Sequence, residues 1–234
     1  MSAIDASSLL RPGLLEGVSV LLAGVHADLD SGSDAGLGDH ASFGGHVAAA
    51  CAGLGARIWP CELPVDGPAG EDHDPVERAT RELLERALAD ARSVDLLAVD
   101  CAGVFARAGR GRDRREQPRV ALRACLTLAW TVTRTVASGA FLPGERGGRV
   151  VYVTPPPTAG EHAEAARAGL ENLARTLSIE WARHAITTVA IAPRDNGEET
   201  ADEVAALTAY LASPAGAYFS GCLLDLRGPA RTAA

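Results

Sequence analysis

Short apolar runs recur along the chain, separated by longer segments in which apolar residues follow a helical spacing. The short runs are apolar throughout rather than alternating, which is typical of strands buried on both faces. Strands are predicted at Val18–Gly24, Ala56–Trp59, Asp95–Asp100, Arg149–Thr154, Ile186–Ala192 and Cys222–Leu226. Because helical segments lie between them, the pattern predicts an α/β fold, a doubly wound parallel sheet with helices on both faces.

Two of the predicted helices have clear starts. Asp74 is a good N-cap and Pro75 suits the first turn, so a helix is predicted to begin there. Thr200 and Glu203 have the spacing of a capping box, which predicts the start of the last helix. Further helices are predicted at His46–Leu54, Pro118–Val136 and Glu161–Arg183, and the last helix is predicted at Thr200–Leu211.

No repeat divides the sequence, so residues 1–234 are predicted to form a single domain. Residues 25–45 are polar and rich in glycine, which predicts a loop insertion. The segment Arg107–Arg119 contains six arginines and is either an anion patch or a solvated loop that leads into a helix. Because Asp113 and Glu116 interrupt the basic run, the solvated loop is favoured.

The composition excludes several kinds of chemistry. All 22 basic residues are arginine, so Schiff-base formation on a lysine and a P-loop lysine are excluded. The five cysteines form no CxxC pair and the six histidines lack ligand spacing, so we expect buried, reduced thiols and no metal site. A net charge of −8 gives no electrostatic reason to bind nucleic acid. Without an apolar span or a signal pattern, we expect a cytoplasmic protein with no membrane contact.

Four segments occur in an order that is typical of one enzyme family. They are Leu15-Glu16-Gly17 before the first strand, VDLLAVDCAGVF at Val94–Phe105, the helix and strand at Arg167–Pro193, and the helix and strand at Glu203–Gly228. Together they resemble the short-chain dehydrogenase/reductase family over nearly the whole chain. The resemblance implies a Rossmann-like fold and the setting of an NAD(P)-dependent oxidoreductase.

The same resemblance shows which residues stand at the family's catalytic positions. The family uses a tyrosine for proton transfer, a lysine four residues later, a serine and an asparagine. Here Ala163 stands at the tyrosine position, Arg167 at the lysine position and Cys125 at the asparagine position, while Thr154 lies in the serine region. Alanine cannot transfer a proton, and arginine does not reproduce the placement of an ammonium group. His162, next to the vacated tyrosine position, is a residue type that can transfer a proton at neutral pH.

The family's nucleotide-binding glycines are only partly matched. Gly24 ends the first strand, but extra chain precedes the helix start, where Ser42 replaces a motif glycine and Phe43 adds bulk. Asp100-Cys101 replace the paired asparagines. The resemblance implies that nucleotide contacts, where they persist, come from Gly24, Gly38, Gly44, Ala102 and Gly103. A re-shaped pocket and a loop that binds nothing both fit this pattern, and the partial motif favours the second, so we expect no cofactor or only weak NAD(P) binding.

One further departure concerns the segment that covers the substrate in the family. Arg194 follows Pro193 and a helix soon begins, so the family's substrate-covering segment is expected to be absent. By contrast, the two long helices that form subunit contacts in the family are regular here. Leu170, Leu173, Leu177 and Trp181 form one stripe, and apolar flanks are predicted at Ala165, Ala168, Gly169 and Ala182, and at Ala121, Ala124 and Leu128.

These departures lead to one hypothesis and two alternatives. The leading hypothesis is a catalytically inactive, structural or regulatory subunit that forms a homodimer or a hetero-oligomer with an active member of the family. The first alternative is an NAD(P)-dependent oxidoreductase with an atypical active site built from Thr154, Arg167 or His162. The second is a small-molecule binding module that uses the emptied cleft.

Overall fold

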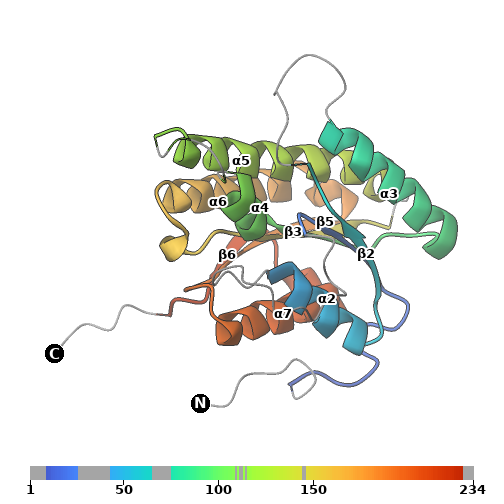
Figure 1. Cartoon of the computed structure of the whole chain (residues 1–234). Coiled ribbons are helices and arrows are strands. Elements are labelled where there is room, and N and C mark those ends of the chain that lie inside the picture. Colours follow the sequence, from blue (N-terminus) through green and yellow to red (C-terminus); the bar gives the residue numbers. More distant parts are fainter. Residues whose placement is uncertain are drawn as a thin grey trace, which may run out of the picture.

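The computed structural model describes residues 9–25, 43–64, 75–108, 110, 113, 115–143 and 146–228. One sheet of parallel strands runs through the molecule in the order β2-β1-β3-β4-β5-β6 (Figure 1). The strands are β1 (Ser19–Ala23), β2 (Arg57–Cys61), β3 (Leu96–Asp100), β4 (Gly148–Val153), β5 (Ile186–Ala192) and β6 (Cys222–Asp225). The chain winds outward from β1 to β2 and then returns past β1 to β3, which confirms the predicted Rossmann-like, doubly wound sheet.

Helices cover both faces of this sheet (Figure 1). One layer contains α3 (Pro75–Ala91), α5 (Gln117–Val136) and α6 (Ala163–Glu180), and the other contains α2 (Phe43–Gly53) and α7 (Glu198–Ala212). Alternate strand residues join two separate apolar clusters, so Leu97 packs under the first layer and Leu96 under the second. Burial on both faces is the physical reason why the central strands β1 and β3 are almost entirely apolar, whereas the edge strands β2 and β6 are only partly buried.

A short helix, α4 (Cys101–Ala108), follows β3 directly and corrects the sequence prediction. The sequence predicts a solvated loop from Arg107 onward, but Arg107 lies in the last turn of α4 and is half-buried. The helix begins here because Asp100 caps it: Oδ1 accepts a hydrogen bond from the N–H of Gly103 at 2.8 Å. Ala102 and Gly103 therefore belong to the first turn of a helix.

The capping box predicted for the last helix is wrong. α7 begins at Glu198, so Thr200 already lies inside the helix, and Gly197 occupies the N-cap position. The Thr200 hydroxyl instead donates to Oδ1 of Asp195 at 2.6 Å, outside the helix. The residues of the predicted box thus stabilise the connection that precedes the helix rather than the first-turn amides.

Other boundaries shift by a few residues. α2 begins at Phe43, earlier than predicted, and buries that ring in the core beneath α2 and α7. α6 ends at Glu180 rather than at Arg183, because the chain tightens there into a 3-10 turn at Ala182–His184. Residues 43–45 of the predicted loop insertion belong to α2. Residues 26–42 of that insertion, including Gly38 and Ser42, and the predicted N-cap Asp74 lie outside the described residues.

The outer face of α5 also differs from the prediction. Ala121 and Leu128 are each 3% exposed and belong to the core, so they are not part of an exposed flank. Leu122 and Leu126, on the same helix, are only partly buried. In the part of the chain that the structure describes, no helix combines the length and the apolar character needed to cross a membrane.

Candidate functional site

The carboxyl ends of β1 and β3 form the crevice where the direction of winding reverses. Gly24 follows β1, and Asp100 is the last residue of β3. In doubly wound folds this crevice is the usual place for ligands, because adjacent connections leave the sheet in opposite directions there. The residues around Asp100 are therefore the first candidates for a functional site.

The Asp100 carboxylate lies at the centre of this crevice and is 1% exposed. Oδ2 accepts a hydrogen bond from the N–H of Gly44 at 3.0 Å, and Oδ1 accepts one from Gly103 at 2.8 Å. Gly44 lies in the first turn of α2 and Gly103 in the first turn of α4. The carboxylate thus binds the N-terminal ends of two helices, which carry partial positive charge.

Glycines surround Asp100 because the backbone segments approach one another closely. Gly24 has φ +86°, and a Cβ there would lie 2.9 Å from the Asp100 carbonyl oxygen. A Cβ on Gly103 would lie 2.8 Å from Oδ2 of Asp100, and one on Gly44 would lie 2.1 Å from Cγ1 of Val25. The structure therefore brings together Gly24, Gly44 and Gly103, three of the glycines predicted to contact a nucleotide. They surround the Asp100 side chain.

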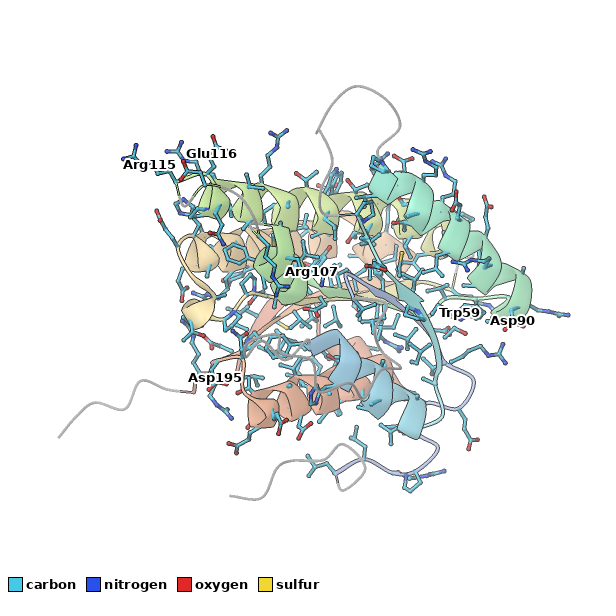
Figure 2. All side chains as sticks on the ribbon, in the orientation of Figure 1. Trp59, Asp90, Arg107, Arg115, Glu116 and Asp195 are labelled. Carbon is cyan, nitrogen blue, oxygen red and sulfur yellow. The ribbon has the colours of Figure 1, made fainter. Side chains whose placement is uncertain are left out.

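Arg107 completes the cluster from α4 (Figure 2). Its Nη2 donates a hydrogen bond to the Gly24 carbonyl oxygen at 2.7 Å. Burial lowers the pKa of Arg107, while the negative charge of Asp100 acts in the opposite direction. The half-buried guanidinium thus links the end of β1 to α4.

Sequence reasoning missed Asp100 and Arg107 as members of this cluster. Asp100 was identified only as a replacement for an asparagine, and Arg107 only as part of a basic run. An available signal was the spacing itself, because an aspartate three residues before Gly103 is the spacing of an N-cap. The hydrogen bond to Gly44, by contrast, joins residues 56 positions apart and has no local signal.

The residues at the family's catalytic positions do not assemble into a proton-transfer site. Ala163, at the start of α6, is 1% exposed, and Cys125 lies fully buried in α5. The Cys125 thiol contacts the Cys101 carbonyl oxygen at 3.6 Å, and burial raises the pKa of Cys101 well above its ordinary value. The Cys101 thiol therefore stays protonated and is a poor nucleophile. The Thr154 hydroxyl, just after β4, is buried and has no hydrogen-bond partner among the described residues.

Arg167 belongs to a network of ion pairs between α6 and the end of β6. Its Nε donates to Glu164 at 2.9 Å, and its Nη1 lies 3.9 Å from Oδ2 of Asp225. Arg227 binds the same two carboxylates, at 3.1 Å to Glu164 and 2.6 Å to Asp225. The charge that the resemblance aligns with a catalytic lysine is therefore already paired within the chain.

The tyrosines and His162 provide no replacement for the missing tyrosine. The Tyr152 hydroxyl is buried 2.9 Å from the Thr133 hydroxyl, and burial raises the pKa of Tyr152. Tyr210 packs edge-on against Phe219, and Tyr218 is 90% exposed. His162 precedes α6 in a left-handed conformation with φ 68°, and its nearest acidic partner is Glu161 at 3.8 Å.

The cysteines and the potential metal ligands were the remaining candidates for a reactive site. Four of the five cysteines are buried and Cys222 is half-buried, and all are free thiols. Across the ranges that the structure describes, no group of His, Cys, Asp and Glu side chains could hold a metal ion. The connection after β5 is short, since α7 begins at Glu198, and this agrees with the expected loss of a substrate-covering segment.

Comparisons with known proteins find structures with a similar fold, but no protein with a similar sequence among the curated proteins. No protein-family model matches the chain, and no curated protein matches its sequence. Among solved structures, it resembles a citronellol catabolism dehydrogenase of Pseudomonas aeruginosa PAO1, with a TM-score of 0.65, 20% identity, and coverage of 93% of this chain and 96% of that one. A short-chain dehydrogenase/reductase variant of Serratia marcescens gives 0.65 at 17% identity over 91% and 97% of the two chains.

Carveol dehydrogenase from Mycobacterium avium, solved in complex with NAD, gives a TM-score of 0.61 at 16% identity, covering 92% of this chain and 97% of that one. These matches span nearly the whole of each protein at low identity. The chain therefore has the fold of the short-chain dehydrogenase/reductases, as the sequence resemblance implied.

Proposed function

We propose that this chain, which has the fold of the short-chain dehydrogenase/reductases, is a catalytically inactive protein that acts as a structural or regulatory subunit of an oxidoreductase complex. The start of α6 carries the proposal. Ala163, which the sequence resemblance aligns with the family's tyrosine, is buried, and Arg167 is paired with Glu164 and Asp225. Neither residue is suited to pass a proton to or from a substrate oxygen.

The crevice at β1 and β3 supports the same proposal. A dinucleotide in this fold places its pyrophosphate against free amides at a helix N-terminus. Here the Gly44 amide donates to the Asp100 carboxylate. The Gly44 amide is therefore not free to bind a pyrophosphate, and we expect NAD(P) binding to be weak or absent.

The outer faces of α5 and α6 support a role in assembly. The two helices pack closely, because a Cβ on Gly169 would lie 2.8 Å from Cδ2 of Leu126. Trp130 on α5 is 43% exposed and Ile179 on α6 is 78% exposed, and Ala168 is exposed on α6. Apolar groups on adjacent helices are suited to a second pair of helices, from another copy or from an active chain of the same fold.

A second candidate function is an NAD(P)-dependent oxidoreductase with an atypical site. The observation that favours it is the Thr154 hydroxyl, buried at the carboxyl end of β4 without a partner among the described residues. An unpaired buried hydroxyl is costly, and such groups are often kept to polarise a substrate. His162, at the N-cap of α6, would then be the residue to transfer the proton.

An activity assay separates the two candidates. The purified chain is assayed with a panel of ketones and alcohols, using NAD and NADP in both oxidation states. We expect no turnover above background. Turnover that disappears in Thr154→Val or His162→Ala, and persists in Thr127→Val, would overturn the proposal in favour of the second candidate. Thr127 is a suitable control because it is exposed on α5.

A further inference from the structure

The groups around Asp100 have the composition of an anion-binding site. Backbone N–H groups from the first turns of α2 and α4 converge on one carboxylate, at 3.0 and 2.8 Å. The Arg107 guanidinium interacts electrostatically with the same carboxylate and holds the Gly24 carbonyl at 2.7 Å. Helix N-terminal amides together with a guanidinium are the groups that proteins use to bind phosphate.

The bound anion in this case belongs to the chain. Asp100 is 1% exposed, so bulk water does not solvate its carboxylate. The ionised form is stabilised instead by the two amides and the guanidinium. A phosphate group at the start of α2 would compete for the Gly44 amide and would lie next to a fixed negative charge in a region of low dielectric. Such repulsion would exclude an anionic ligand. The same carboxylate also holds the first turns of α2 and α4 through its hydrogen bonds.

We propose that Asp100 is a built-in substitute for the phosphate of a dinucleotide, and that its charge excludes anionic ligands from the crevice between β1 and β3. The inference rests on the proposed function, because a chain without catalysis has no need to bind the cofactor. It makes Asp100 the residue that determines nucleotide affinity.

The test uses a substitution that changes charge more than shape. In Asp100→Asn, the amide oxygen still caps α4 at Gly103, but the amide nitrogen cannot accept the Gly44 N–H. The Gly44 amide then loses its hydrogen-bond acceptor within the chain. Affinities of the full chain for inorganic pyrophosphate and for NADH are measured by calorimetry. We expect both to rise at least tenfold in Asp100→Asn relative to the unmodified chain.

A matched control lies at the other end of the same strand. The Asp95 carboxylate accepts a hydrogen bond from the N–H of Ser19 at 2.8 Å, just before β3 begins. Asp95→Asn therefore changes the net charge by the same amount and weakens a similar bond, away from the crevice. We expect its affinity for pyrophosphate to equal that of the unmodified chain, and an equal rise in both variants would overturn the inference.

Further outcomes keep the test decisive. Asp100→Ser provides a second neutral variant that can still cap α4. If either variant does not fold in buffer, recovery of its native circular dichroism in millimolar pyrophosphate supports the inference, and failure of both to recover overturns it. Folded variants without any gain in affinity overturn it as well.

The inference and the proposed function can fail separately. Low-micromolar binding of NADH by the unmodified chain would overturn the exclusion of nucleotides. The proposal of an inactive subunit would still stand if that chain showed no turnover. Turnover by the unmodified chain would remove the proposed function, while the comparison of Asp100→Asn with Asp95→Asn would still measure the effect of the charge.

Discussion

Asp225 shows how a single side chain can connect two segments of this fold. At the end of β6 it binds Arg227 at 2.6 Å and lies 3.9 Å from Arg167 on α6. The hydrogen bond from Arg227 lowers the pKa of Asp225, and the charge of Arg167 acts in the same direction. A carboxyl group with a depressed pKa in the folded state stabilises that state only while it is ionised.

The pH dependence of stability tests this network. Above about pH 4, the ordinary value for an unfolded aspartate, the contribution of Asp225 is fully present, and it is lost as the pH falls through the lower folded pKa. We expect Asp225→Asn to reduce the free energy of unfolding at pH 7 by ~0.5–1 kcal/mol, since the pair is partly exposed. Urea titrations should show this difference disappearing at low pH. Asp90→Asn, which breaks an exposed pair with Arg57, is the control and should change little.

Gly103 offers a second test at the residue scale. A Cβ there would lie 2.8 Å from Oδ2 of Asp100 and 3.2 Å from Nη1 of Arg107. Alanine is normally the better helix residue by about 1 kcal/mol, yet at this position it must displace a buried, hydrogen-bonded carboxylate. We expect Gly103→Ala to lower the free energy of unfolding by about 1–3 kcal/mol.

Gly53→Ala is the matched control for that substitution. Gly53 is the last residue of α2, and a Cβ there would meet nothing within 4 Å. This variant should be neutral or more stable by up to about 1 kcal/mol. Equal effects of the two substitutions in thermal or urea unfolding would show that the contact with Asp100 has no energetic consequence.

At the scale of elements, the connection from β5 to α7 is held by one arginine. Arg194 binds Glu203 through two nitrogen atoms, at 2.6 and 3.1 Å, and Glu203 lies one turn inside α7. Because a bidentate pair fixes geometry as well as charge, it anchors the short connection against the helix. The connection between β5 and α7 is therefore a short, braced turn.

The strength of that brace can be compared with an ordinary surface pair. Arg194→Ala should cost about 1–2 kcal/mol in unfolding free energy, because it leaves the partly buried Glu203 without its partner. Arg175→Ala removes an exposed pair with Glu171 within α6 and should cost less than about 0.5 kcal/mol. Equal losses in urea unfolding would contradict a bracing role for Arg194.

The elements differ in how far the sequence could predict them. The strands were predicted to within a few residues, since burial on both faces leaves an unbroken apolar pattern. α4 was missed because it is short and ends in the basic run at Arg107, which resembles a solvated loop. The buried positions of Ala121 and Leu128 were missed because a helix between two neighbours, here α3 and α6, buries more than one stripe.

The sequence predicted several individual residues of the candidate site, but not how they contact one another. Gly24, Gly44 and Gly103 were identified one by one, and the structure brings them together. The residue that joins them is Asp100, whose contact with Gly44 depends on the sheet order rather than on local sequence. Ion pairs such as Arg167 with Asp225 were equally out of reach, because long side chains choose partners only once the elements are packed.

At the scale of the whole molecule, the two helical layers differ in what they leave exposed. The layer of α3, α5 and α6 carries Trp130, 43% exposed, and Ile179, 78% exposed. In the other layer, α2 and α7 themselves carry no exposed large hydrophobic side chain among the described residues, although Tyr218, in the turn after α7, is 90% exposed. If the molecule assembles, the layer with exposed large apolar groups is therefore the face that we expect to be covered.

The last prediction tests this assembly with a single charge. Ala168 is exposed on α6, next to Gly169 where α6 approaches Leu126 of α5. We expect the unmodified chain to be a homodimer, or to pair with an active chain of the same fold, and Ala168→Glu to dissociate it without unfolding. A charge buried between helices without a partner is strongly unfavourable, whereas the same glutamate is harmless in water. Ala49→Glu, on the exposed side of α2 in the other layer, is the matched control and should leave the assembly intact. Light scattering gives the masses and circular dichroism the fold; a monomeric mass for the unmodified chain, both alone and mixed with that active chain, would rule out the subunit role.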